Sequence, residues 1–218
     1  MSTKNYFQKR ADQFDSLYDE ESKWHYWFNQ IFRKGLFERV ALTAHEIESI
    51  RGGTVLDVGC GSGRNSIAFA KAGAQHIVGI DFSERMVELA TAFSRKHDMG
   101  AVCTFIEGDF LSYAFDRKFD VVVALGVFDY LAKPQSFLRR MVELTQRKVI
   151  ASFPKPSLVR APLRKVRYAL RNCPVYFYTP NRLVDICKDI GLSNYRILNY
   201  TSGLFLVGHM DRNDMSQK

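Results

Sequence analysis

The sequence predicts a doubly wound α/β sheet of seven strands with helices between them. Two observations predict it. Short apolar runs typical of buried strands alternate with helical stretches from residue 54 to residue 210. The stretch TVLDVGCGSGRNSIAFAKAGAQHIVGID joins a strand, a glycine-rich turn, a helix and a second strand, and such units require a parallel sheet. At 218 residues, with 46% hydrophobic and 25% charged residues, the chain suits one globular domain.

The elements follow in order from Thr54. The first strand begins there, a helix spans 65–72 with Gly73 as its C-cap, and the second strand, 76–80, ends at Asp81. Ser83 is a typical N-cap residue for the helix that follows the second strand. The remaining elements are expected as a helix at 84–97, strands at 102–110 and 119–128, a helix at 134–146, a strand at 148–153, a helix at 181–191, and closing strands at 195–200 and 203–210.

The first fifty residues predict a helical N-terminal extension. It contains the aromatic cluster KWHYWFNQIF, followed by apolar residues in rough helical spacing. Two interpretations stay open. The extension is either a helix that contributes aromatic side chains to the core or a lid over a ligand pocket.

Positive charge is concentrated in the second half of the chain. The formal net charge of +8 favours anionic partners such as nucleic acid, a membrane surface or an acidic small molecule. No acidic residue occurs between Glu143 and Asp185, whereas nine basic residues do: Arg147, Lys148, Lys155, Arg160, Arg164, Lys165, Arg167, Arg171 and Arg182. Within this basic insertion, residues 157–172 have the pattern of a basic amphipathic helix. Such a helix would cover the sheet or cleft, recognise an acidic substrate, or dock on an anionic membrane.

The sequence also indicates location and metal content. No run reaches the roughly 18 apolar residues of a membrane-spanning helix, and the polar start MSTKNYFQKR has no signal-peptide core. We therefore expect a cytoplasmic protein, with peripheral membrane association as an added hypothesis. The four cysteines, Cys60, Cys103, Cys173 and Cys187, lack metal-ligand spacing, so we expect reduced thiols and no metal site.

The glycine-rich turn and the acid after the second strand predict a ligand site. Ligands of open parallel sheets bind beyond the carboxyl ends of the strands. Glycine at Gly59, Gly61 and Gly63 permits a tight turn and close approach of the backbone, and the following helix presents free amides. Asp81, 22 residues after Gly59, can accept both hydroxyls of a ribose. By itself the turn would also suit a tight strand-to-helix connection.

The pattern D-x-G-x-G-x-G from Asp57 resembles the class I S-adenosylmethionine-dependent methyltransferases. Four ordered motifs carry the resemblance: LDVGCGSG, IVGIDFS, EGDF and FDVVVALGVFDYL, over residues 54–131. The resemblance implies a Rossmann-like methyltransferase sheet and S-adenosylmethionine as cofactor. With its aromatic start and basic insertion, the chain also loosely resembles magnesium-protoporphyrin O-methyltransferases and, more distantly, methyltransferases of ubiquinone biosynthesis.

The first two motifs imply roles at the methionine and ribose end of the cofactor. Asp57 and the backbone of residues 59–63, Cys60 included, would hold the methionine part and the adjoining ribose. Asp81 would bind the ribose hydroxyls, and Phe82 would pack on the adenine. A carboxylate that faces a cationic donor is also electrostatically favourable.

The later motifs imply the other cofactor contacts. Asp109 would accept from the adenine amino group, with the Phe110 backbone nearby, and Leu125 would lie under the sulfonium. The start YFQKRADQFDSLYD resembles the aromatic opening of many small-molecule methyltransferases, in which an early tyrosine closes over the cofactor. The candidates there, which also suit a core, are Tyr6, Phe14 and Tyr18.

Candidate catalytic residues lie after the fourth strand and in the aromatic extension. Asp129 and Tyr130 follow the fourth strand, where this family often has polar residues that face the substrate. His25 is a further candidate base, and His209 is expected to be structural. Asp129 also suits a turn, and His25 a packed or exposed histidine. A carboxylate acceptor needs no base, whereas a hydroxyl or amine can need one.

The leading hypothesis is methyl transfer to oxygen, with nitrogen second, of an acidic or amphiphilic small molecule. One alternative is RNA methylation, although ALGVFDY lacks the N-P-P-Y or D-P-P-Y tetrapeptide of amino-methylating enzymes. Another is a protein that binds S-adenosylmethionine without turnover. We expect one domain with a helical cap (1–50), a cofactor-binding core (51–153), a substrate-side insertion (154–180), and a closing helix and strands (181–210).

Overall fold

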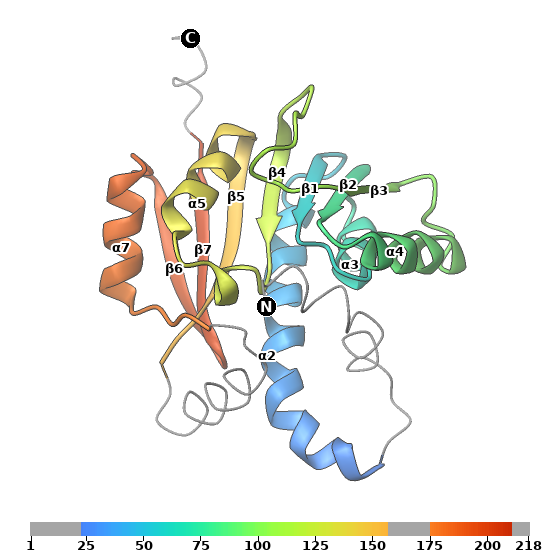
Figure 1. Cartoon of the computed structure of the whole chain (residues 1–218), viewed down its shortest axis with the longest axis horizontal. Helices are drawn as coiled ribbons and strands as arrows, with labels where there is room; N and C mark the ends of the chain where they lie inside the picture. The colour runs from blue at the N-terminus through green and yellow to red at the C-terminus, as the bar shows by residue number, and fades with distance from the viewer. Residues whose placement is uncertain (1–22, 157–174, 211–218) are drawn as a thin grey trace.

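A computed structural model describes residues 23–156 and 175–210, with side chains from residue 34 onward, and it contains one seven-stranded mixed sheet. The strands are β1 (Thr54–Val58), β2 (His76–Asp81), β3 (Cys103–Glu107), β4 (Phe119–Ala124), β5 (Thr145–Pro154), β6 (Tyr195–Tyr200) and β7 (Gly203–His209). Their spatial order is β3-β2-β1-β4-β5-β7-β6 (Figure 1). β1 to β5 run parallel. The predicted seven-stranded doubly wound α/β sheet is confirmed.

The last strand in the sequence runs against the others. β7 is antiparallel to both of its neighbours, β5 and β6. Only Thr201 and Ser202 separate the paired residues Tyr200 and Gly203. A connection this short joins antiparallel strands only, because a parallel crossover needs a dozen or more residues. The β6–β7 hairpin therefore folds back and places β7 between β5 and β6.

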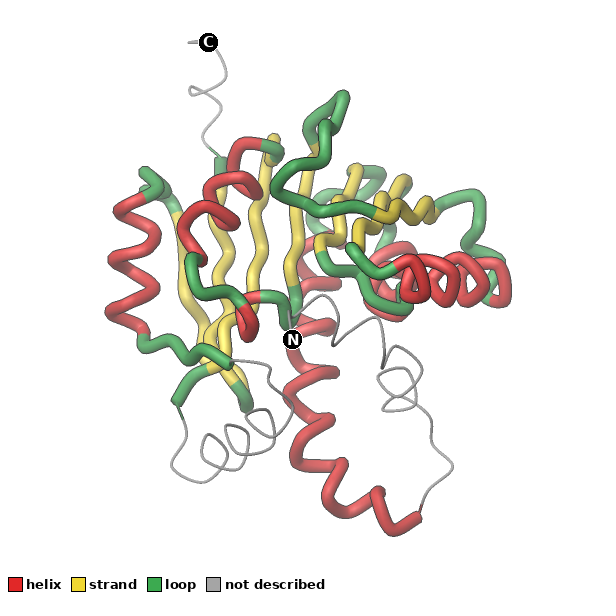
Figure 2. Tube along the Cα trace, viewed as in Figure 1, coloured by secondary structure: helices red, strands yellow, loops and turns green. Residues whose placement is uncertain are grey.

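Helices cover both faces of the sheet. They are α2 (Lys23–Glu48), α3 (Arg64–Lys71), α4 (Glu84–Lys96), the 3₁₀ helix η2 (Phe128–Tyr130), α5 (Pro134–Glu143) and α7 (Pro180–Asp189). In Figures 1 and 2, α5 and α7 lie in front of the β5–β7–β6 half, and α2 passes behind the sheet. α3 and α4 contribute to the same apolar layer as α2. The result is a three-layer α/β sandwich.

The core consists of two apolar layers, one on each face. Along β1, Val55 packs in the layer with α2 and α3, and Leu56 packs in the layer with α5 and α7. Side chains of a strand alternate between faces, so a strand buried on both sides must be apolar throughout. This explains the unbroken apolar run of β4, in which Val121, Val122 and Val123 are all buried.

The element boundaries differ from the predicted ones by a few residues. α3 spans 64–71 with Ala72 as C-cap, and Gly73 follows it with φ +99°. Ser83 caps α4 as predicted, because its side chain accepts from Met86 N at 3.4 Å. β5 begins at Thr145, three residues before the predicted start at 148, and α5 ends at Glu143.

Several sequence predictions lie outside the described residues. They include the basic amphipathic helix at 157–172 and the cofactor-closing aromatics Tyr6, Phe14 and Tyr18. The helical extension is described from Lys23, where α2 begins. Over the ranges 23–156 and 175–210, no helix has the length and apolar character needed to cross a membrane. The four-part division of the domain stays a prediction.

Candidate functional site

The glycine-rich turn after β1 is built from three residues with positive φ. Gly59, Gly61 and Gly63 have φ of +69°, +53° and +77°, a region that L side chains rarely adopt. A Cβ at Gly59 would lie 2.5 Å from Cγ2 of Val127, and one at Gly63 would lie 2.9 Å from Cβ of Ala90. A Cβ at Gly61 would meet nothing within 4 Å. Packing therefore demands glycine at the outer two positions, whereas Gly61 faces open space that suits a ligand.

Asp81 at the end of β2 fixes the turn. Its carboxylate accepts from the backbone N–H of Gly61 and of Ser83, each at 3.0 Å. Burial raises the pKa of Asp81, and the amides that donate to it act in the opposite direction. The carboxylate thus holds the ligand-facing glycine and has further lone pairs for two ribose hydroxyls.

Asp57 lies beneath the turn as a buried acid. It is 1% exposed and accepts from Ser66 Oγ at 2.6 Å. Burial raises its pKa to about 6, the Ser66 hydrogen bond lowers it, and the charge of Asp81 raises it further. Among the described side chains, no lysine, arginine or histidine forms an ion pair with Asp57. The site therefore favours a ligand that carries positive charge.

Cys60, between the first two glycines, contributes backbone rather than chemistry. The side chain is buried, and burial raises the pKa of the thiol well above its usual value. The N–H groups of Gly59 and Cys60 both donate to Ile80 O, at 2.8 and 3.2 Å. A thiol in this state is a poor nucleophile.

The predicted adenine-binding residues follow the ends of β2 and β3. Gly108 N donates to Asp81 O at 2.9 Å, which brings the loop after β3 beside Asp81. Asp109 is exposed, and its Oδ1 accepts from Leu111 N at 3.0 Å. Phe110 is buried with its ring 4.7 Å from that of Phe137, so only its backbone can face a ligand. Phe82 is partly buried after β2.

The segment after β4 meets the glycine-rich turn from the other side. Leu125 is buried, Val127 packs on Gly59, and Asp129 lies in η2 with 7% exposure. Tyr176 N donates to Asp129 O at 2.9 Å, which ties η2 to the end of the basic insertion. Tyr130 is the last residue of η2 and is partly exposed.

The two histidine candidates lie elsewhere. His25 is in the first turns of α2, where the structure gives the course of the helix only. His209 pairs with Lys148 near the start of β5. That is the amino-terminal edge of the parallel strands, opposite the glycine-rich turn. The side chains that the structure describes include no cluster of acids, histidines and cysteines suited to a metal ion.

Arg39 on α2 is a candidate that the sequence analysis missed. A Cβ at Gly126, directly after Leu125, would lie 3.0 Å from both Nη atoms of Arg39, and Gly126 has φ +81°. The guanidinium therefore lies against the bare backbone that follows β4. Its Nε is buried without an acceptor, and no carboxylate in the described part of the chain pairs with it. A partly buried cation without a counter-ion suits a ligand carboxylate.

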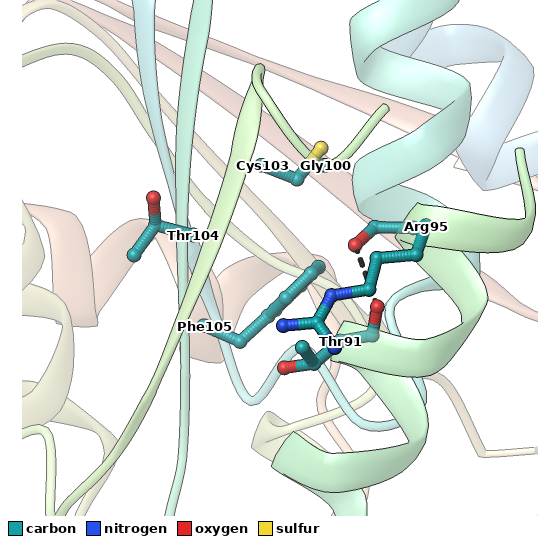
Figure 3. A pocket seen from close by; sticks show the side chains of 7 residues that line it. Thr91, Arg95, Gly100, Cys103, Thr104 and Phe105 are labelled. Atoms are coloured by element: carbon teal, nitrogen blue, oxygen red, sulfur yellow. Dashed lines mark hydrogen bonds between the residues drawn. The ribbon is translucent and has the colours of Figure 1, made fainter. Parts of the chain in front are cut away.

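A separate hollow of about 250 Å³ lies between α4 and β3 (Figure 3). It is lined by Thr91, Ser94, Arg95, Gly100, Cys103, Thr104 and Phe105. These strand residues belong to the amino-terminal half of β3, whereas the candidate site uses the carboxyl ends. The ring of Phe105 lies close to Gly63, which makes the hollow a neighbour of the turn but not part of it.

The open sheet, the glycine-rich turn and the acid after β2 define a nucleotide-binding α/β protein of the Rossmann-like class. Residues 49–182 match the methyltransferase domain family. The chain therefore belongs to this family and is an S-adenosylmethionine-dependent methyltransferase, as its resemblance to class I enzymes predicted. The predicted cofactor is confirmed at the level of the family. The open space beside Gly61 and the absence of an ion pair with Asp57 among the described side chains fit a cationic nucleoside.

Two curated relatives and one solved structure illustrate the similarity. The ubiquinone biosynthesis O-methyltransferase of Neisseria meningitidis serogroup C is 27% identical over 175 residues, 71% of this chain and 73% of that protein. A sterol 24-C-methyltransferase of Yarrowia lipolytica is 31% identical over 56% of this chain, which spans 33% of that protein. The magnesium protoporphyrin IX methyltransferase of Synechocystis PCC 6803 with bound SAH has a TM-score of 0.77 at 23% identity, covering 95% of this chain and 98% of that one.

Proposed function

We propose that this enzyme methylates an oxygen, with nitrogen second, of an acidic or amphiphilic small molecule. The observation that carries the proposal is where the basic insertion begins and ends. Tyr178 N donates to Pro154 O at 2.8 Å, and Tyr176 N donates to the backbone oxygen of Asp129 at 2.9 Å. Both ends of the cation-rich segment are thus anchored beside the residues after β4. Cations near the acceptor side favour an anionic acceptor.

The relatives support the same class of acceptor. The similar proteins are a ubiquinone biosynthesis O-methyltransferase, a sterol 24-C-methyltransferase and a magnesium protoporphyrin IX methyltransferase. Those acceptors belong to those proteins, and for this enzyme we propose only a small amphiphilic or acidic acceptor. Binding to an anionic membrane through residues 157–172, from a cytoplasmic location, belongs to the same proposal.

We assign the cofactor contacts as follows. Asp57 and the turn at residues 59–63 would face the methionine part and the adjoining ribose, and Asp81 the ribose hydroxyls. Phe82 and Asp109 would contact the adenine, and Leu125 would lie under the sulfonium. Arg39 would take the methionine carboxylate, because it is a partly buried cation beside the segment after β4. S-adenosylmethionine, when bound, supplies a methyl group on an electrophilic sulfonium.

The role of the protein in the reaction would be largely orientation. Holding the acceptor atom in line with the methyl carbon can account for roughly 7–11 kcal/mol of barrier in model systems. A carboxylate acceptor would need no base. For a hydroxyl or amine acceptor, Asp129 is the candidate to accept the proton, because it lies in η2 directly after β4. Tyr130 and His25 are the other candidates.

The site assignment is tested by Asp81→Ala. The change removes the acceptor for the Gly61 amide and the proposed ribose contact, so affinity for S-adenosylmethionine measured by calorimetry should fall strongly. Unchanged affinity would contradict the assignment.

The acceptor class is tested with methyl-labelled S-adenosylmethionine, purified protein and a cell extract, followed by separation into organic, small aqueous, protein and RNA fractions. Label in the organic or small aqueous fraction is expected. Label in RNA would favour RNA methylation, which also predicts binding that weakens steeply with salt. Cofactor binding with no labelled product in any fraction would favour a role without turnover.

A further inference from the structure

Tyr200 reaches from the edge of the sheet towards its centre. It is the last residue of β6, and two strands, β7 and β5, separate it from β4. Its ring crosses β7 at Gly203, where a Cβ would lie 2.9 Å from both Cε1 and Oη of Tyr200. Any side chain at Gly203 would therefore displace the ring. The ring is 7% exposed and packs in the same apolar layer as the C-terminal half of α2.

The phenol of Tyr200 lies near polar groups from two other elements. Arg39 on α2 and Ser152 on β5 both lie close enough to it to lower its pKa, and α2 contacts the adjoining hairpin directly, since Thr201 N donates to Glu38 Oε2 at 2.9 Å. The Oγ of Ser152 also accepts from Gly126 N at 2.9 Å. Gly126 is the bare residue against which the Arg39 guanidinium lies. The four residues form a closed set around the end of β4.

This set of residues can fix the side-chain conformation of Arg39 before a ligand binds. An arginine side chain loses considerable rotamer freedom when it is fixed, and a binding site gains affinity if that loss occurs before the ligand arrives. The described residues offer Arg39 no carboxylate partner to fix it. Tyr200 supplies a neutral one, because a tyrosine phenol is protonated at neutral pH, and burial raises the pKa of this one further. A neutral partner orients the guanidinium without neutralising its charge.

We propose that Tyr200 is a positioning residue that holds Arg39 ready for the carboxylate of the cofactor. The inference rests on the proposed function, which assigns Arg39 to the methionine end. It predicts that Tyr200 affects ligands with a carboxylate and spares the same ligands without one.

Calorimetry with two ligands tests it. One is S-adenosylhomocysteine, and the other is S-adenosyl-3-thiopropylamine, the same molecule without the carboxylate. Tyr200→Phe keeps the buried ring and removes the hydroxyl. It should lower the affinity for S-adenosylhomocysteine by about five- to tenfold and leave the affinity for the decarboxylated ligand unchanged. Arg39→Gln should lower the affinity for S-adenosylhomocysteine more than Tyr200→Phe does. The double variant should have the same affinity as Arg39→Gln alone, because the two residues act as one unit.

Tyr195→Phe is the matched control, since Tyr195 lies at the other end of β6 and packs in the opposite apolar layer. It should bind both ligands like the wild type. Three results would overturn the inference. Tyr200→Phe could bind S-adenosylhomocysteine with wild-type affinity, or it could lose affinity for both ligands equally. Its loss of affinity could also add fully to that of Arg39→Gln. Wild-type protein that does not bind S-adenosylhomocysteine would instead overturn the proposed function, and the inference with it.

Discussion

The carboxylate of Glu46 on α2 lies 2.8 Å from the ammonium of Lys148 on β5. The two side chains are 7% and 13% exposed, so water screens this pair weakly. Arg196 on β6 pairs with the other oxygen of Glu46, and the Lys148 ammonium also donates to Ser49 Oγ at 2.8 Å. The C-terminal end of α2 is therefore fastened to two strands, and through α2 this ion cluster fixes where Arg39 lies.

Replacing Glu46 with Ala should destabilise the protein markedly. The change leaves the largely buried ammonium of Lys148 without its carboxylate partner. Removing one partner of a buried ion pair typically lowers the free energy of unfolding by about 3–5 kcal/mol. Because Arg196 is half-exposed, we expect a loss of about 2–4 kcal/mol in a urea denaturation. Glu48→Ala is the control, because Glu48 is exposed and pairs only loosely with His45 at 3.9 Å. Equal stability of the two variants would show that the ion cluster does not hold α2.

The cofactor end of the site was predictable because its signals are local. The D-x-G-x-G-x-G pattern and Asp81 lie within one strand–helix–strand unit, so spacing alone brings them to one edge of the sheet. Seven strands could also be counted from apolar runs. The direction of β7 follows from the two residues between Tyr200 and Gly203, a constraint that the sequence analysis did not use.

Arg39 and Tyr200 could not be predicted in the same way. They lie 161 positions apart, and only the packing of α2 against the β6–β7 hairpin brings them together. Arg39 is one of 31 lysines and arginines, and no motif distinguishes it. Hindsight offers one weak signal, since glycines at 126 and 203 each leave room for a side chain from a distant element.

Gly61→Ala should impair cofactor binding more than folding. The new methyl group would enter open space on the ligand side, and its positive φ of +53° costs about 1–2 kcal/mol. Gly191→Ala is the matched control, because Gly191 has φ +76° and also has nothing within 4 Å of a Cβ. Both variants should lose similar stability, while only Gly61→Ala should weaken S-adenosylmethionine, by about tenfold or more. Similar affinities for both variants would place the ligand elsewhere.

Asp57→Asn should remove a pH dependence. The folded-state pKa of about 6 lies above the ordinary value of 3.8, so the folded protein holds this proton more tightly than the unfolded chain. The stabilisation is complete below pH 3.8 and is lost as the pH rises through about 6, with a total on the order of 3 kcal/mol. Urea denaturation at pH 5 and 7.5 should therefore show that the free energy of unfolding of Asp57→Asn rises relative to that of the wild type at the higher pH.

The affinity of the wild type for S-adenosylmethionine should change in the opposite sense. A cationic ligand favours the ionised carboxylate, so binding should strengthen from pH 5 to 7.5 and should be flatter in Asp57→Asn. Asp116→Asn, at an exposed loop position, serves as control and should follow the wild type. Parallel pH profiles for Asp57→Asn and the wild type would contradict the assigned charge.

Tyr178→Phe should loosen the segment that carries Asp129. The buried Tyr178 hydroxyl shares its one proton between Phe128 O and Leu131 O, both at 3.2 Å, on either side of Asp129. Its loss leaves two carbonyls short of a donor, at a cost of about 1–3 kcal/mol in the free energy of unfolding. Because η2 lies after β4 and the cofactor contacts lie around the turn, methyl transfer should fall several-fold at unchanged affinity for S-adenosylmethionine. Tyr113→Phe, at a partly exposed tyrosine beside the loop after β3, is the control. A Tyr178→Phe protein that loses cofactor affinity in proportion to activity would show that η2 serves the cofactor and not the acceptor.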